Sequence, residues 1–353
     1  MPREFSDKPG VAEPQPGGIH SRPGAARTKV AWWRSRLPAL LKIAITATIL
    51  FYVARQVDFR AVVERASAAS LPFLTLSIAS LLLIPLLGGI RWWMVLRAMD
   101  RPDRLAPLVA LFWIAMLFGQ ILPAAAGDGV RIWIASRRGA GLRTAIHSVL
   151  LERVSMVLML LVVVVATEPL LSTRVGPSQA LWIAPMLLSA GVAGLTVLIV
   201  ADRLTARFQR WPLVRSLANL ATDTRQVAFS AWMLPLSVLG VLTNLNFVVA
   251  GALLGVALYL PLSFLDYLAF FPLVMVAMVL PISFSGWGVR EGVLVALLGT
   301  VGVPIQTAFA FSLMFGACVA VSSLPGLAIW WLDPDRKRPG SDRDPNAGPL
   351  VKA

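Results

Sequence analysis

Six charged residues lie within or beside long apolar stretches of the chain, and they comprise three acids and three bases. They are Asp128, Arg131, Glu152, Arg153, Arg290 and Glu291. A charged side chain at the centre of a membrane helix costs roughly 2.5–3.5 kcal/mol on insertion scales, so such residues usually face one another or a polar ligand. The arginine guanidinium presents planar donors that suit phosphate, and the acids could balance charge or carry protons. The set predicts a polar site for an anion, with purely structural salt bridges as the alternative.

Four of these charges lie in or next to a phrase that occurs twice. Residues 122–131 read LPAAAGDGVR, and residues 280–290 read LPISFSGWGVR. Proline and glycine interrupt helices, and both copies follow a long apolar run. The phrase therefore predicts two broken helices, whose tips hold Pro123, Gly127, Gly129, Pro281, Gly286 and Gly288.

Each broken helix is expected to present the start of a half-helix to the interior. We expect these half-helices to begin near Gly129 and Gly288, with Arg131 and Arg290 in their first turns. Free N–H groups and the helix dipole favour an anion at such a position. Non-helical backbone at membrane depth is tolerated only where protein buries it or water lines it. The two tips should therefore border a cavity near the middle of the membrane.

The composition is that of an integral membrane protein. The chain has 353 residues, of which 57% are hydrophobic and 14% charged, whereas soluble domains carry about a quarter charged residues. The net charge is +14, but the basic residues flank apolar spans and do not interleave with aromatics, so we expect no nucleic-acid partner. The single cysteine, Cys318, excludes an intramolecular disulfide.

Most apolar segments approach the ~20 residues that a helix needs to cross a membrane. Residues 1–36 and 333–353 are rich in Pro, Gly and charge and are expected to be disordered tails around a membrane domain at 37–332. Residues 203–229 predict an amphipathic helix on the membrane surface, or alternatively a polar loop. The expected apolar segments are 37–54, 70–90, 106–126, 142–166, 180–200, 230–256, 263–283, 288–303 and 305–331.

The distribution of Lys and Arg favours one way of threading these segments. If 106–126 and 263–283 both cross fully, inside loops hold 17 basic residues and outside loops 11. If each repeated phrase is instead the tip of a re-entrant hairpin, the numbers become 24 and 4. Cytoplasmic loops carry the excess of basic residues, so the hairpins are preferred. We therefore expect six full spans plus two re-entrant hairpins, with both termini cytoplasmic.

This threading makes the two halves of the chain mirror one another. Residues 37–166 would run span, span, inner hairpin, span, and residues 180–331 would run span, span, outer hairpin, span. Repeats of opposite orientation, each with a broken helix in the corresponding place, are typical of secondary transporters. The fold expected is an all-α polytopic membrane protein with an inverted-topology repeat.

The remaining polar residues predict structural roles. Arg91 is expected to extend toward the cytoplasmic end of its span, and Asn244 and Asn246 to hydrogen-bond between helices. Zinc-protease, nucleophile-elbow, P-loop and paired-cysteine motifs are all missing from the sequence. We therefore expect no enzyme, with no catalytic residue, metal site or cofactor.

The repeated phrase and the LLER of residues 150–153 resemble the flippase-like transmembrane domain of lysylphosphatidylglycerol synthases. LPISFSGWGVREG at 280–292 carries the same resemblance, which covers about residues 37–332. It implies a bacterial inner-membrane protein that moves a lipid between leaflets or works beside a lipid-modifying enzyme. By motif match it also points to Pro123, Asp128, Arg131, Glu152, Arg153, Pro281, Gly288, Arg290 and Glu291. Only about 20 polar residues follow the last apolar segment, so aminoacylation by this chain alone is not expected.

These observations leave two functional hypotheses. The first is a flippase for an anionic lipid or a polyprenyl-phosphate carrier, in which Arg131 and Arg290 hold the head group. Glu152 and Arg153 would then gate the path or balance charge. The second is a membrane subunit or scaffold of an enzyme that modifies lipids or glycans, with that enzyme as its partner.

Overall fold

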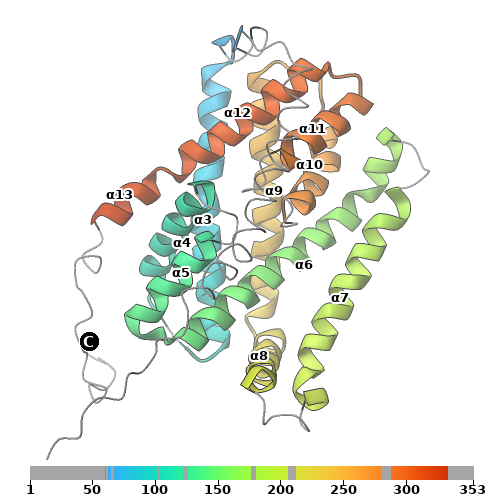
Figure 1. Cartoon of the computed structure of the whole chain (residues 1–353). Coiled ribbons are helices and arrows are strands. Elements are labelled where there is room, and N and C mark those ends of the chain that lie inside the picture. Colours follow the sequence, from blue (N-terminus) through green and yellow to red (C-terminus); the bar gives the residue numbers. More distant parts are fainter. Residues whose placement is uncertain are drawn as a thin grey trace, which may run out of the picture. The chain divides into compact units, whose positions relative to one another are not determined.

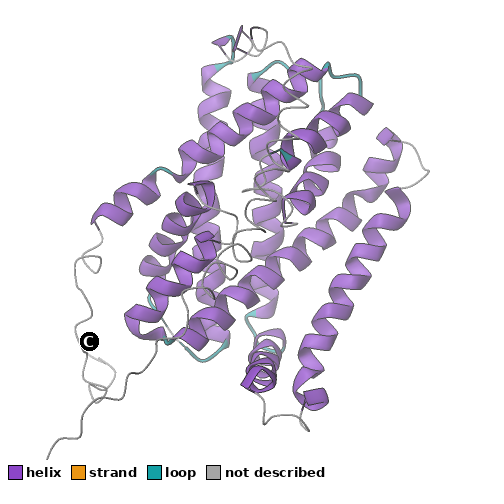
Figure 2. Cartoon of the chain, viewed as in Figure 1, coloured by secondary structure: helices purple, strands orange, loops and turns teal. Residues whose placement is uncertain are grey.

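The computed structural model describes residues 60, 63–64, 67–101, 103–121, 126–175, 180–205, 212–279 and 288–332, and every regular element among them is a helix (Figures 1 and 2). Four helical stretches are long and apolar enough to cross a membrane. They are α3 (Leu71–Ala98), α6 (Leu142–Val175), α9 (Met233–Ala257), and the pair α12 (Ile305–Ser323) and α13 (Pro325–Leu332). The expected all-helical membrane class is thereby confirmed.

Helices α3 and α9 pack antiparallel along their whole length. At one end the Ser70 amide donates to the Ala257 carbonyl oxygen at 2.8 Å, and farther along the Ser77 hydroxyl donates to the Ala250 carbonyl oxygen at 2.8 Å. At the opposite end Ala98 packs in the same cluster as Leu236. We call these two ends of the pair the Ser70 end and the Ala98 end.

Helices α4 (Leu105–Ile121) and α5 (Ala126–Ala135) form a hairpin that begins and ends at the Ala98 end (Figure 1). The indole nitrogen of Trp93 donates to the Asp103 carbonyl oxygen, which holds the start of α4 beside α3. From there α4 runs back along α3, because Gly88 and Gly89 leave room for its side chains and backbone. Helix α5 returns along α4, and a short π-helical turn, η1 (Ser136–Ala140), follows it.

Helices α10 (Phe264–Val279) and α11 (Val289–Thr300) form the corresponding hairpin at the Ser70 end. The Tyr267 ring lies against Gly255 and the Phe271 ring against Gly251, so α10 runs back along α9 from its Ala257 end. Helix α11 leads to Val303, which packs in one cluster with Leu258 and Leu260 at the Ser70 end. The two hairpins thus approach the α3 and α9 pair from opposite ends.

Helix α7 (Ala180–Thr205) packs on α6 and on α8 (Pro212–Ala228). Helix α8 buries Ala218, Ala221 and Val227 on one side, as an amphipathic helix does. His147 of α6 pairs with Asp223 of α8 at 2.5 Å and joins this helix to the bundle. The amphipathic helix predicted within 203–229 is present, but it begins at Pro212, and Arg203 belongs to α7.

Several helices extend beyond their predicted ends. Helix α3 continues to Ala98 and α6 to Val175, eight and nine residues past the expected limits of 90 and 166. The last expected segment is divided, because α12 ends at Ser323 and α13 begins at Pro325, where proline suits the first helical position. The expected span at 37–54, both tails, Pro123, Pro281 and Gly286 lie outside the described residues.

Candidate functional site

Three buried charges from three helices meet beside the first hairpin. The Arg91 guanidinium of α3 donates to one carboxylate oxygen of Glu152 in α6. Arg131 of α5 donates to the other oxygen at 3.0 Å. All three side chains are at most 1% exposed. One carboxylate therefore bridges two arginines that the chain separates by 40 residues.

Two further charges extend this group toward the surface. Asp128 accepts hydrogen bonds from Arg153 Nε at 2.8 Å and from Arg153 Nη2 at 3.0 Å. Its Oδ1 atom also lies 3.0 Å from Arg131 Nη2. The Arg153 side chain is 44% exposed. We call Arg91, Asp128, Arg131, Glu152 and Arg153 the Glu152 cluster; it carries three positive and two negative charges.

Aromatic rings hold the Arg131 guanidinium in place. Its central carbon lies 4.9 Å from the centre of the Trp92 ring and 4.7 Å from that of Phe112. The face of an aromatic ring attracts a cation, and the attraction strengthens away from water. The Trp92 indole in turn donates to the Ser148 hydroxyl at 3.0 Å. Helices α3, α4 and α6 thus all fix the position of Arg131.

The Glu152 cluster has spare donors. Nε and Nη1 of both Arg91 and Arg131 are buried without a hydrogen-bond partner in the described part of the chain. Buried polar groups are normally paired, so four N–H-bearing atoms without partners call for an acceptor. With one excess positive charge, the cluster can accept an anionic oxygen group such as a phosphate.

The second copy of the phrase forms a more local arrangement. Gly288 has φ 83°, a left-handed conformation that favours glycine, and its amide donates to Glu291 Oε2 at 2.5 Å to cap α11. Arg290 donates to the other oxygen, Oε1, of the same carboxylate. Both side chains are at most 5% exposed. Here the acid and the base come from one turn of one helix.

A glycine on the neighbouring helix α12 accommodates Arg290. A methyl group added at Gly316 would lie 2.1 Å from Arg290 Nη2. We expect Gly316→Ala to displace Arg290 and to lower the free energy of unfolding by about 1–3 kcal/mol through overpacking. The measurement is a denaturant titration in mixed micelles. Gly299→Ala is the matched control, because a methyl group there meets nothing within 4 Å and should leave stability unchanged or raise it. Equal effects of the two substitutions would contradict the contact.

The structure brings Asp128, Arg131, Glu152 and Arg153 together, and it places Arg290 against Glu291. The prediction for Arg91 was wrong: α3 continues seven residues past it, so its side chain is buried and meets Glu152. Asn246 does bond between helices, to Ser80, whereas the Asn244 amide donates within α9, to Gly240.

The half-helix starts were predicted correctly at only one of the two phrases. Helix α11 begins at Val289, directly after Gly288. Helix α5 begins at Ala126, so Gly129 lies inside it and Arg131 falls in its second turn rather than its first. Gly127 permits close packing, because a methyl group there would lie 2.3 Å from the Ala115 carbonyl oxygen, whereas Gly129 has open space. Among the described residues, no three His, Cys, Asp or Glu side chains group as metal ligands.

The helices and the buried charges define a multi-pass integral membrane protein with an ionic site between its helices. Residues 39–326 match the profile of the family described as "Lysylphosphatidylglycerol synthase TM region". The match covers most of the chain, so the protein belongs to this family, and the resemblance drawn from the repeated phrase is confirmed. A search of curated proteins gave no significant match. The family places the protein among membrane proteins of lipid-related function.

Proposed function

We propose that this protein is a flippase that moves an anionic lipid, or a polyprenyl-phosphate carrier, between the leaflets of the bacterial inner membrane. The observation that carries the proposal is the pair of buried guanidinium groups, Arg91 and Arg131, with unpartnered donors around one carboxylate. A site that served only to stabilise the fold would leave fewer donors unused. The protein's own part is to bind and pass the head group, without covalent chemistry.

Two re-entrant hairpins would give the head group its path. We propose that α4 and α5 enter from the cytoplasm and that α10 and α11 enter from the opposite side, with six full spans around them. The Ala98 end carries Arg97, Arg101, Arg104, Arg137, Arg138 and Arg143, whereas the described residues at the Ser70 end carry Arg60 and Arg174, the latter paired with Asp266. This asymmetry supports a cytoplasmic Ala98 end.

The inverted repeat and the domain limits follow from this threading. The membrane domain would cover 37–332, with repeats at about 37–166 and 180–331, and both termini would be cytoplasmic. The hairpins approach α3 and α9 from opposite ends, as repeats of opposite orientation require. The repeated phrase then occupies the same position in each half.

The Glu152 cluster would act by exchanging partners. An arriving phosphate accepts from the free donors of Arg91 and Arg131 and competes with Glu152 for both guanidinium groups. In the empty site the carboxylate compensates the charges of Arg91 and Arg131. When the head group leaves, Glu152 pairs with both arginines again, which lowers the free-energy cost of release. Arg290, paired with Glu291, would offer the next positive charge to the lipid on its way across.

Reconstitution into liposomes tests this function. A trace of fluorescent phosphatidylglycerol is placed in both leaflets, and a membrane-impermeant reductant is added outside. When the protein is present, we expect the reductant to quench more than the half of the fluorescent lipid that lies in the outer leaflet. The double variant Arg131→Ala with Arg290→Ala should quench no more than empty liposomes do. The same assay with a fluorescent polyprenyl phosphate tells the two substrates apart. If neither lipid crosses, the proposal fails.

A second candidate function is favoured by the family description, which names the membrane region of a lipid-modifying enzyme. In that case the chain would be the membrane subunit or scaffold of such an enzyme. Affinity purification under mild detergent should then recover one stoichiometric partner. Lipid modification in the cell would also persist after neutralisation of Arg131 and Arg290.

A further inference from the structure

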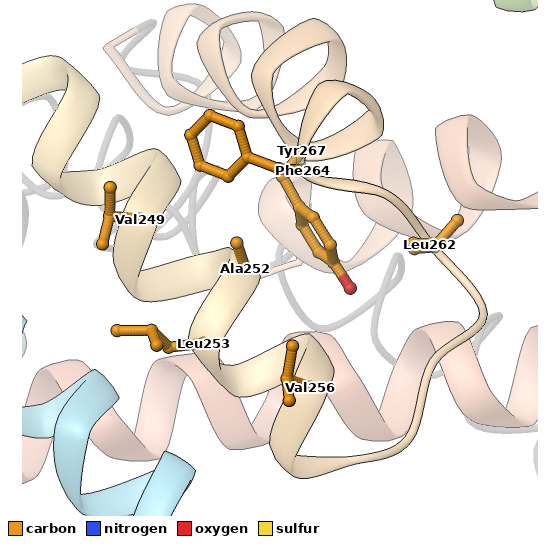
Figure 3. A pocket seen from close by; sticks show the side chains of 7 residues that line it. All are labelled: Val249, Ala252, Leu253, Val256, Leu262, Phe264 and Tyr267. Carbon is orange, nitrogen blue, oxygen red and sulfur yellow. The ribbon is translucent and has the colours of Figure 1, made fainter.

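A separate groove, lined by apolar side chains and one tyrosine, shares no residue with the ionic contacts of α3 with α6. It lies between α9 and α10 at the Ser70 end and has a volume of about 200 Å³ (Figure 3). Val249, Ala252, Leu253 and Val256 form its α9 wall, and Leu262, Phe264 and Tyr267 form the other. We propose that this groove binds one acyl chain of a membrane phospholipid, with the Tyr267 hydroxyl donating to the ester carbonyl oxygen.

The shape of the groove fits a hydrocarbon chain. Val249 and Val256 are seven residues apart on one face of α9, which gives a strip about 11 Å long. The volume is below the roughly 300–1,000 Å³ of pockets that enclose whole small molecules, so the groove holds part of a ligand. Val256 is 45% exposed and Phe264 50% exposed, so the groove opens sideways from a membrane-spanning helix. In a membrane, the lateral face of a spanning helix is surrounded by lipid acyl chains.

The Tyr267 hydroxyl, the single polar side-chain atom among the seven lining residues, indicates which part of the lipid meets it. Tyr267 is only 3% exposed, and its hydroxyl has no hydrogen-bond partner among the described residues. Figure 3 shows this hydroxyl directed into the space between α9 and the loop that carries Leu262. A buried hydroxyl without a partner is unfavourable, so an acceptor from the ligand is expected there.

The depth of Tyr267 matches an ester group. Its ring lies against Gly255, two residues before the end of α9, where a methyl group would overlap the hydroxyl. The end of a spanning helix lies where hydrocarbon gives way to polar head groups, and tyrosine is enriched at that level. Tyr259, 73% exposed, lies just beyond it. The glycerol esters of a phospholipid occupy this boundary, with the acyl chains below.

Photo-crosslinking tests the proposal. The photoreactive residue p-benzoylphenylalanine replaces Phe264 at the rim of the groove, and in a matched control it replaces Phe73. Phe73 is also an exposed phenylalanine, 41% exposed, and lies near the start of α3 at the same end. In liposomes of ester-linked phosphatidylglycerol and phosphatidylethanolamine, intact-mass analysis should show a one-phospholipid adduct at least fivefold more abundant at position 264 than at 73.

Two added substitutions identify the binding contacts. Ala252→Trp fills the groove and should lower the adduct at position 264 to the level of the Phe73 control. Tyr267→Phe removes one oxygen, and should lower the adduct about threefold with ester-linked lipid but not with ether-linked lipid. Size-exclusion profiles show whether each variant folds. If Ala252→Trp fails to fold, Tyr267→Phe still tests the proposal. The proposal would be overturned if the adducts at positions 264 and 73 were equal, or if Tyr267→Phe left the adduct with ester-linked lipid unchanged. It would also be overturned if position 264 crosslinked to residues 37–54 or to a second copy of the chain.

Discussion

Glu152→Gln should lower the free energy of unfolding by about 3–5 kcal/mol, the usual cost of removing one partner from a buried ion pair. The carboxylate faces two arginines that are at most 1% exposed, and its loss removes the ion pair of Arg91, because Asp128 pairs with Arg131 and Arg153 instead. The measurement is a denaturant titration in mixed micelles. Glu64→Gln, at an exposed glutamate, is the control and should change stability by less than about 0.5 kcal/mol.

A double-mutant cycle shows whether the effect arises from the ion pair. Arg91→Met combined with Glu152→Met replaces both charges with apolar side chains of similar length. Because apolar replacement of a whole buried pair is often neutral, we expect the double variant to be more stable than Glu152→Met alone. Additive losses from the two single substitutions would contradict the pairing.

Arg131→Gln should reduce lipid translocation at least tenfold, whereas Arg153→Gln should reduce it less than threefold. Arg131 is buried and has two nitrogen atoms without partners, whereas Arg153 is 44% exposed and uses Nε and Nη2 on Asp128. A hydrogen bond to a charged group contributes about 1.5–3 kcal/mol, and 1.4 kcal/mol corresponds to a factor of ten. The assay is the liposome reduction rate per reconstituted protein.

The structure also limits the damage that Arg131→Gln does to the fold. Glu152 keeps its partner Arg91, so the buried carboxylate is not left uncompensated. Arg131→Lys keeps the charge but loses the planar fork, and we expect an intermediate rate. Equal losses from Arg131→Gln and Arg153→Gln would contradict binding of the head group by the buried donors of Arg131.

Much of the fold was predictable because proline, glycine and charge mark the ends of apolar segments. The repeated phrase separates α4 from α5 and α10 from α11, as it predicted, although α5 begins three residues before Gly129. The helix ends differed from the prediction, because a membrane helix can continue past its apolar stretch. Thus α6 extends to Val175 through Glu168 and Arg174, which composition alone assigns to a loop.

The sequence singled out Asp128, Arg131, Glu152 and Arg153, but neither Arg91 nor the pairing of these charges across helices. Arg91 pairs with Glu152, 61 residues away, and no local pattern reports such a contact. A signal was nevertheless present: Trp92 and Trp93 follow Arg91 in the same apolar context, which favours a helix that continues past the charge. The sequence does not distinguish the two glycines Gly127 and Gly129 either. In the structure only Gly127 faces the Ala115 carbonyl oxygen, which is again a contact with another helix.

Cysteine labelling shows whether the two hairpins enter the membrane from opposite faces, as the proposed threading requires. Single cysteines replace Asp103, Arg143, Tyr259 and Thr300, which are all exposed, in a background where Cys318 is changed to Ala. The reagent is a membrane-impermeant maleimide on intact spheroplasts, before and after permeabilisation. We predict that positions 259 and 300 react at once and that positions 103 and 143 react only after permeabilisation. Reaction of all four positions from one side would contradict the account.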